Sequence, residues 1–125
     1  LEGFTYIQIL YWFDILDKPD LRSKLTLDKP YKKGPDTLGI FATRSPMRPN
    51  PIGITPCYVT YIDKDSGIIG LGWCDAFDKT PVIDIKPYTP SVDRVENPEV
   101  PNWCNHWPKC VEESGEFNWE SEFNF

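Results

Sequence analysis

Apolar residues gather in short runs along the chain, and most of these runs lack a helical period. The first, Phe4 to Leu16, is rich in Ile, Tyr, Phe and Trp with little polar alternation, which predicts a strand buried on both faces. Two further runs, Thr55 to Ile62 and Ile68 to Trp73, flank the polar residues 63–67, and this arrangement predicts a hairpin. A shorter strand is expected at Leu38–Thr43, and Val82–Ile85 is a short apolar element between Pro81 and Pro87.

The stretches between these runs are polar and rich in proline. Residues 17–37 are basic and follow no period, which is typical of a functional or mobile loop. Asn50 and Pro51 suit the cap and first position of a single helical turn. Beyond Tyr88 the chain is rich in proline, acidic residues and tryptophan. The last residues, Glu116 to Phe125, are expected to form a packed arm or a short helix.

Composition narrows the fold class. The chain has 125 residues, of which 40% are apolar and 14% aromatic, enough for one folded domain with a single core. Thirteen prolines and eight glycines favour short strands and loops over helices. We therefore predict one mostly β domain over residues 1–125: a small antiparallel β-barrel with short helical turns and an irregular C-terminal arm, residues 89–125, packed on it. No apolar run reaches about 18 residues, so no membrane span is expected.

Charge is unevenly distributed along the chain. The net charge of −6 argues against a nucleic-acid partner. Residues 21–50, however, contain seven basic and two acidic side chains, whereas residues 91–125 contain eight acidic and two basic ones. A basic half and an acidic tail suit a surface that binds phosphates at one place, although ordinary unevenness of charge explains the pattern equally well.

The four cysteines, Cys57, Cys74, Cys104 and Cys110, would form two disulfides in a secreted protein. No leader precedes Leu1, and no Asn-x-Ser/Thr acceptor is present. Cys57 and Cys74 lie in apolar runs and are expected to be buried thiols. We therefore expect a reducing, cytoplasmic compartment.

Residues 39–54, Gly-Ile-Phe-Ala-Thr-Arg-Ser-Pro-Met-Arg-Pro-Asn-Pro-Ile-Gly-Ile, are difficult to explain by folding alone. Three prolines within six residues exclude a helix interior or a central strand and predict a stiff loop. This loop carries Arg44 and Arg48 on a nearly fixed path, as a preformed site for a carboxylate or phosphate requires. A rigid connector with solvated arginines is the alternative.

The same segment closely resembles the first signature of the TrmO family, also called TsaA-like proteins. The run Asp78-Lys-Thr-Pro-Val-Ile-Asp-Ile-Lys-Pro-Tyr88 resembles the family's second signature, in which Gly usually stands at the position of Lys79. A weaker third match covers Leu1 to Phe4 and Ile9 to Phe13. Together these matches follow the family's order and span most of the chain.

The resemblance implies a small β-barrel methyltransferase that uses S-adenosylmethionine. In the family, the substrate is a tRNA adenosine beside the anticodon that already carries threonylcarbamoyl on its exocyclic nitrogen. A further N-terminal segment precedes the Leu-Glu-Gly-Phe block in the family, and we expect it to be missing here. The positions matching the family's cofactor contacts are Phe13, Asp14, Arg44, Ile54, Asp78, Lys79, Thr80 and Pro81. Two of them depart from the pattern, since the family often has His at Asp14, and Lys79 occupies a turn that favours a positive φ.

Methyl transfer also requires that the acceptor nitrogen lose a proton. Asp84, flanked by Ile83 and Ile85, is the candidate base, because apolar surroundings raise a carboxylate's pKa. The alternative is that Asp84 pairs with Arg44 or Lys86 and only joins two loops. Arg48 and Lys86 suit RNA phosphates, and Tyr88 suits stacking on a base or plain core packing.

Two other functions remain open. A noncatalytic RNA-binding module would use the basic segment and keep the proline-arginine loop as a scaffold. A zinc-dependent interaction protein is the second, since Cys104, His106 and Cys110 form a Cys-x-His-x3-Cys pattern. A tetrahedral zinc site needs a fourth ligand, and none is evident, so no metal is expected. For the methyltransferase we expect a homodimer, because a small barrel with an open face rarely encloses a cofactor alone.

Overall fold

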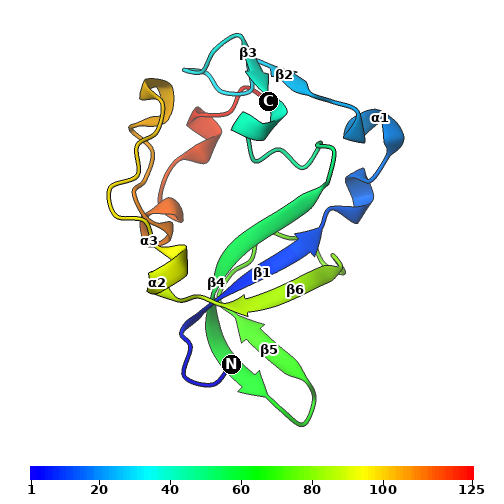
Figure 1. Ribbon diagram of the computed structural model, residues 1–125, viewed down its shortest axis with the longest axis vertical. Helices are drawn as coiled ribbons and strands as arrows, with labels where there is room; N and C mark the ends of the chain where they lie inside the picture. The colour runs from blue at the N-terminus through cyan, green and yellow to red at the C-terminus, as the bar shows by residue number, and fades with distance from the viewer.

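An antiparallel four-stranded sheet forms the centre of the fold in the computed structural model, which describes residues 1–125. Its strands are β1 (Tyr6–Trp12), β4 (Ile52–Asp63), β5 (Ile68–Leu71) and β6 (Val82–Pro87), in the order β5-β4-β1-β6. A separate two-stranded ribbon consists of β2 (Thr26–Asp28) and β3 (Thr37–Gly39). The sheet and the ribbon lie at opposite ends of the molecule, with the N-terminus near the sheet and the C-terminus near the ribbon (Figure 1).

Helical structure is confined to single turns. The α-helices are α1 (Pro19–Arg22), α2 (Pro90–Asp93) and α3 (Val111–Ser114), and 3-10 turns occur at Asp14–Leu16, Ile40–Ala42, Asn102–Cys104 and Trp119–Ser121. Proline opens both α1 and α2, where its fixed φ suits the first helical turn and its missing N–H leaves no partner unsatisfied. None of these helices combines the length and apolar character that crossing a bilayer requires.

The mostly β prediction is confirmed, whereas the prediction of a closed barrel is wrong. β5 pairs only with β4, and β6 pairs only with β1, so both remain edge strands of an open sheet. Closing a barrel would require pairing between these two edges. β5 has only four residues and pairs with the C-terminal end of the 12-residue β4, from Val59 to Asp63.

The core lies on one face of the sheet. β1 places Ile7, Ile9 and Tyr11 on that face, where they pack with Cys57 of β4. The prediction that this first strand is buried on both faces is wrong, because its alternate residues are only half-buried. These half-buried residues of β1 lie on the outer face of the sheet. On that face Ile54 of β4 pairs with Leu10, and the Ile54 side chain is 44% exposed.

Local structure follows the sequence pattern at the hairpin and departs from it near residue 50. β4 and β5 form the predicted hairpin, in which the Asp63 carboxylate accepts hydrogen bonds from the backbone N–H groups of Asp65 and Ser66. The predicted turn capped by Asn50 is absent, since Pro51 leads directly into β4. The strand expected over 38–43 ends at Gly39 and continues as a 3-10 turn. The irregular segment 17–37 contains α1 and β2.

The segment predicted as an irregular arm over 89–125 begins with α2, and its remainder, residues 95–125, called the C-terminal arm below, returns to the loop that joins β2 to β3. Tyr31 and Phe123 form an isolated antiparallel bridge, and the Lys32 N–H donates to the Glu122 carbonyl at 2.9 Å. The Asn124 N–H donates to the Pro30 carbonyl at 3.1 Å. Figure 1 shows the arm passing from α2 through α3 to the ribbon, so that it spans from the sheet to the far end of the molecule.

Candidate functional site

A cavity of about 810 Å³ lies between the proline-arginine loop, the adjoining ends of β1 and β4, and the C-terminal arm. Eleven of its 18 lining residues are hydrophobic, and the polar ones include both arginines of the loop. A mostly apolar cavity with a few polar groups is the usual form of a small-molecule site. Of the residues chosen from sequence, Phe13, Arg44, Arg48 and Ile54 line it.

The proline-arginine loop is held by its own polar side chains. The buried Thr43 hydroxyl donates to the Ile40 carbonyl at 2.8 Å and accepts from the Ser45 N–H at 3.2 Å. The Ser45 hydroxyl in turn accepts from the Met47 N–H at 3.3 Å. These bonds, together with the fixed φ of the prolines, account for the predicted stiffness.

Two guanidinium groups brace the same loop. Arg48 donates to the carbonyls of Thr43 and Ser45 at 3.0 and 3.4 Å, and its guanidinium lies over the ring of Phe41. Arg22 of α1 donates to the Pro49 carbonyl at 2.9 Å and pairs with Asp17 at 3.1 Å. Arg48 therefore shapes the loop, and its donors are already partly used.

Arg44 differs from Arg48 because its side chain has no internal partner. It is exposed, it lines the cavity, and it makes no ion pair or side-chain hydrogen bond with the rest of the protein. A guanidinium group presents five N–H donors in a planar fork that matches a carboxylate or phosphate. Arg44 is thus a cation available to an anionic ligand in a preformed cavity.

Tyr11 and Gly53 form the wall of this cavity where β1 meets β4. Their positions are paired in register, and a Cβ added to Gly53 would lie 2.3 Å from the Tyr11 ring and 2.9 Å from the Phe13 ring. The Tyr11 hydroxyl donates to the Asp75 carbonyl at 2.5 Å and lies 3.0 Å from the Thr55 hydroxyl. Burial raises the pKa of Tyr11, so this hydroxyl keeps its proton and its hydrogen bond at neutral pH.

The second signature forms a turn just before β6. Lys79 has a φ of 66°, so the turn does adopt the left-handed conformation that the sequence comparison associated with glycine. The Pro81 carbonyl accepts from the Trp12 N–H at 2.9 Å, which places this turn beside the end of β1. Asp78 to Pro81 and Asp14 do not line the cavity, although they flank the segment that contains Phe13.

Asp84 and Lys86 lie on the edge strand β6. Asp84, Leu10 and Ile54 occupy matching register positions on three neighbouring strands, so their side chains share one face of the sheet. The separation across two strand spacings is about 10 Å. Tyr88 follows the strand, and its ring packs edge-on against Tyr6, with centroids 6.4 Å apart.

The expectation that apolar neighbours raise the pKa of Asp84 is wrong. Asp84 is exposed and pairs with Lys86 at 2.9 Å, as the alternative interpretation anticipated. The hydrogen bond from Lys86 and the N–H of Ile85 lower the pKa of Asp84 instead. Lys86 donates to this carboxylate, and the same pairing raises the pKa of Lys86.

Sequence reasoning missed the aromatic side of the cavity. Tyr31 from the basic segment and Trp103 and Trp107 from the C-terminal arm line it, and Tyr31 stacks on Trp103 with centroids 5.1 Å apart. Burial raises the pKa of Tyr31, and the nearby Arg44 partly opposes this shift. The only signal in the sequence is an excess of tryptophan in an arm without periodicity, which does not indicate what the rings contact.

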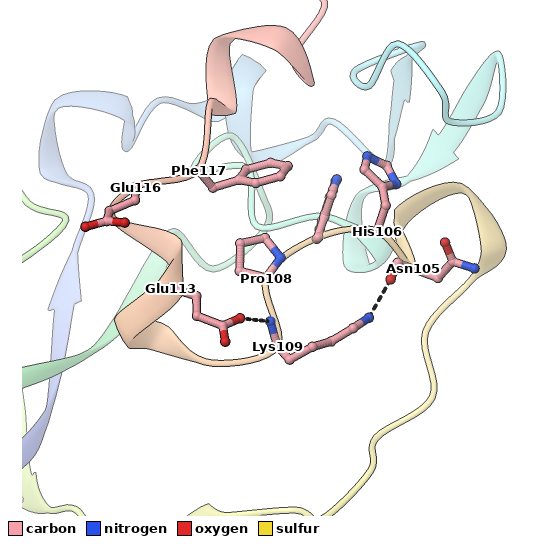
Figure 2. A pocket seen from close by; sticks show the side chains of 8 residues that line it. Asn105, His106, Pro108, Lys109, Glu113, Glu116 and Phe117 are labelled. Carbon is pink, nitrogen blue, oxygen red and sulfur yellow. Dashed lines mark hydrogen bonds between the residues drawn. The ribbon is translucent and has the colours of Figure 1, made fainter.

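A second, smaller cavity of about 460 Å³ lies within the arm itself (Figure 2). Its walls come from the single stretch 105–117, in which Glu113 accepts from the Lys109 N–H and the Lys109 ammonium donates to the Asn105 carbonyl. None of the residues predicted to bind cofactor or RNA lies here. The two hydrogen bonds drawn in Figure 2 each join residues four positions apart, so they stabilise the local path of the arm.

The Cys-x-His-x3-Cys pattern does not form a metal centre. No group of three or more His, Cys, Asp or Glu side chains is arranged to hold a metal ion. His106 instead contacts the Glu122 carboxylate at 2.9 Å, and the Cys104 thiol donates to the Pro101 carbonyl. Hydrogen bonds from His106 and Trp107 lower the pKa of Glu122, which is 5% exposed.

All four cysteines are free thiols, and Cys57 is buried as predicted, while Cys74 is half-buried. Burial, with the neighbouring Cys74 as a second cause, raises the pKa of the Cys57 thiol to about 12. Such a thiol remains protonated and unreactive near neutral pH.

Comparison with known proteins identifies relatives over most of the chain. The family model described as the tRNA-methyltransferase O N-terminal domain matches residues 1–94. An S-adenosyl-L-methionine-binding protein of Archaeoglobus fulgidus is 39% identical over 99 residues, which cover 79% of this chain and 66% of that protein. The tRNA (adenine(37)-N6)-methyltransferase of Escherichia coli is 42% identical over 92 residues, covering 72% of this chain and 38% of the enzyme.

Solved structures that resemble this chain are also of TrmO proteins. The crystal structure of TrmO from Pseudomonas aeruginosa superposes with a TM-score of 0.56 at 29% identity, covering 79% of this chain and 38% of that one. Another crystal structure of TrmO has a TM-score of 0.58 at 30% identity and covers 80% of this chain and 40% of its own. The chain thus spans only part of the length of the relatives it matches.

Proposed function

The chain belongs to the tRNA-methyltransferase O N-terminal domain family, and on this basis we propose that it binds S-adenosylmethionine and methylates the exocyclic nitrogen of an adenosine in tRNA. The names of its relatives, an S-adenosyl-L-methionine-binding protein and a tRNA (adenine(37)-N6)-methyltransferase, support both parts of the proposal. The observation that carries it is the unpaired Arg44 in an apolar cavity bounded by the first signature. The finer substrate is an adenosine next to the anticodon that carries threonylcarbamoyl.

The residues of the cavity fit this cofactor chemically. Arg44 would bind the carboxylate of the methionine moiety, and Phe13 and Ile54 would provide apolar contact. The turn from Asp78 to Pro81, held beside Phe13 by the Trp12–Pro81 hydrogen bond, would offer backbone groups from the adjoining side. When bound, the cofactor supplies a methyl group on a sulfonium centre.

Asp84 is the proposed proton acceptor. It shares the sheet face of Ile54, and its lowered pKa means that it is ionised at neutral pH. A carboxylate with a lowered pKa is a weak base. It would therefore take the proton after the nitrogen has been methylated, when that nitrogen is much more acidic.

RNA would approach over the same face. Lys86 lies on the edge strand next to Asp84, Tyr88 follows that strand, and Arg48 lines the cavity. The exposed side chains of Ile52 and Ile54, 42% and 44% accessible, favour a homodimer in which a second copy covers part of this apolar surface. The proposed compartment is the cytoplasm, where tRNA is available.

The first test replaces Arg44. We expect Arg44→Ala to reduce the affinity for S-adenosylmethionine at least about tenfold, because a charge-assisted guanidinium–carboxylate contact contributes roughly 1.5–3 kcal/mol. Calorimetric titration measures this change, and circular dichroism verifies the fold. Arg94→Ala is the matched control, since Arg94 is exposed, pairs loosely with Glu96 at 3.9 Å and does not line the cavity.

The second measurement separates catalysis from simple RNA binding. Labelled S-adenosylmethionine is incubated with bulk tRNA, and the nucleosides are then analysed for N6-methylated adenosine. A chain that binds tRNA in a salt-dependent manner but has no affinity for the cofactor would instead be a noncatalytic RNA-binding module. Unchanged cofactor affinity in Arg44→Ala would remove Arg44 from the site.

A further inference from the structure

One wall of the cavity comes from outside the residues that the family model matches. The family model ends at residue 94, whereas Pro101, Trp103, Cys104 and Trp107 all line the cavity. The signatures at 39–54 and 78–88 form the opposite side and the adjoining turn. The C-terminal arm is therefore part of the site by position, although it lies beyond the matched domain.

The rings on this wall are held in place before any ligand binds. Trp103 stacks on Tyr31 with planes 22° apart, and Trp107 packs edge-on against Trp103 at 5.4 Å. The Trp107 indole N–H donates to the buried Glu122 carboxylate at 3.1 Å. Rings fixed in this way lose little conformational entropy when they contact a flat ligand.

The two sides of the cavity differ in chemistry. The arm supplies aromatic surface through Trp103 and Trp107, while the loop supplies the unpaired cation Arg44 and the exposed ring of Phe41. A ligand that satisfies both sides carries a flat ring and an anionic group. Aromatic side chains hold nucleobases by stacking, and every base has a π-face.

We propose that the aromatic wall of the C-terminal arm, with Trp103 at its centre, binds the adenine ring of the ligand that enters the cavity. This inference rests on the proposed function and extends it by assigning a binding role to a segment beyond residue 94, where the family model ends. The adenine has two sources, the cofactor and the target adenosine of the RNA, and both present the same ring to the wall.

The test compares ligands and variants by calorimetry on the full chain. S-adenosylhomocysteine has both an adenine ring and a carboxylate, whereas 5′-methylthioadenosine has the adenine ring but no carboxylate. We expect Trp103→Leu to weaken both about tenfold, in the range measured for loss of one aromatic stack. Arg44→Ala should weaken only S-adenosylhomocysteine. Trp103→Phe, which keeps a ring on Tyr31, should restore most of the affinity.

Trp119→Leu is the matched control. Trp119 packs on Trp107 at 5.4 Å and on Phe117 at 4.8 Å, yet it does not line the cavity. It should lower thermal stability at least as much as Trp103→Leu while leaving both affinities unchanged. If the two variants weaken binding equally, Trp103 acts only through packing and the proposal is overturned.

An RNA arm of the experiment identifies the source of the ring. An anticodon stem-loop RNA is titrated alongside the same RNA with uridine in place of the target adenosine. A loss in Trp103→Leu confined to the adenosine-containing RNA assigns the wall to the substrate, and a loss confined to the nucleoside ligands assigns it to the cofactor. If folded Trp103→Leu binds every ligand as the unaltered protein does, the inference fails. Absence of S-adenosylhomocysteine binding to the unaltered protein would instead refute the proposed function.

Discussion

Arg44 and Arg48 show how two identical side chains in one loop acquire different roles. Arg48 donates to two carbonyls of its own loop, whereas Arg44 has no partner and lines the cavity. The difference arises from the path of the backbone around Thr43, which brings two carbonyls within reach of Arg48. At this scale, the chain uses one arginine to build the site and leaves the other for a ligand.

Lys79 occupies a backbone conformation that is unfavourable for its side chain. At a φ of 66° an L-residue with a Cβ is strained by roughly 1–2 kcal/mol, and glycine is not. We expect Lys79→Gly to raise the free energy of unfolding by about 1 kcal/mol, after allowing for the greater freedom of glycine in the unfolded chain. Urea denaturation measures the change. Lys79→Val should shift stability in the opposite direction, and a loss of stability in Lys79→Gly would contradict this account.

β1 and β4 are the elements that position the site. They pair from Tyr6–Tyr58 to Trp12–Ile52, and just beyond this pairing the Phe13 N–H donates to the Pro51 carbonyl at 2.8 Å. The long strand thus connects the proline-arginine loop to the core through a continuous set of backbone bonds. Gly53 lets the rings of Tyr11 and Phe13 pack over β4, because they fill the space that a side chain at this position would take.

A methyl group at Gly53 tests the packing of the Tyr11 and Phe13 rings over this position. We expect Gly53→Ala to destabilise the protein by roughly 1–3 kcal/mol, because the added Cβ overlaps the Tyr11 ring and the core must shift. Cofactor affinity should fall as well, since both rings line the cavity. Gly39→Ala is the control, as a Cβ there meets nothing within 4 Å and its φ of −62° suits any residue. Equal stability of the two variants in urea would show that the rings of Tyr11 and Phe13 can move aside without loss.

At the scale of the whole molecule, the acidic C-terminal arm contacts the basic segment, residues 17–37. The uneven charge seen in the sequence becomes a contact in which Lys33, His106 and Glu122 follow one another, with distances of 3.4 and 2.9 Å. Main-chain bonds from Lys32 and Asn124 reinforce it. Part of the basic segment is therefore used within the protein, which reduces the charge available to RNA.

Glu122 makes this contact sensitive to acid. Folding lowers its pKa below the ordinary value of 4.5, so its stabilising contribution is complete above pH 4.5 and is lost as the pH falls through the folded-state value. We expect Glu122→Gln to lower the Tm by several degrees at pH 7, with the difference shrinking below pH 4.5. Tryptophan fluorescence during thermal unfolding at a series of pH values measures both effects. A difference that stays constant with pH would rule out the carboxylate as the cause.

Prediction from sequence succeeded for features that depend on neighbouring residues. The hairpin over 55–73 follows from local backbone preferences. The positive φ at Lys79 does not follow from the residue itself and was indicated only by the glycine that the family usually has at this position. The barrel, the burial of both faces of the first strand and the raised pKa of Asp84 were predicted wrongly. The first two depend on which strands meet across the fold, and the linear pattern does not contain that information. The pKa of Asp84 is instead set by Lys86, two residues away on the same strand, a pairing that the sequence had offered as the alternative.

The strand-forming runs, the loop with its two arginines and the family signatures are predictable from the sequence alone, because each depends on residues that are close together in the chain. Tertiary contacts are what bring Arg44, which has no partner within the protein, and the tryptophans of the arm to the same cavity. These outcomes depend on pairing between β4 and β1 and on the return of the C-terminus to Tyr31. Contacts between residues more than 60 positions apart, such as that of Tyr31 with Trp103, are set by the path of the whole chain.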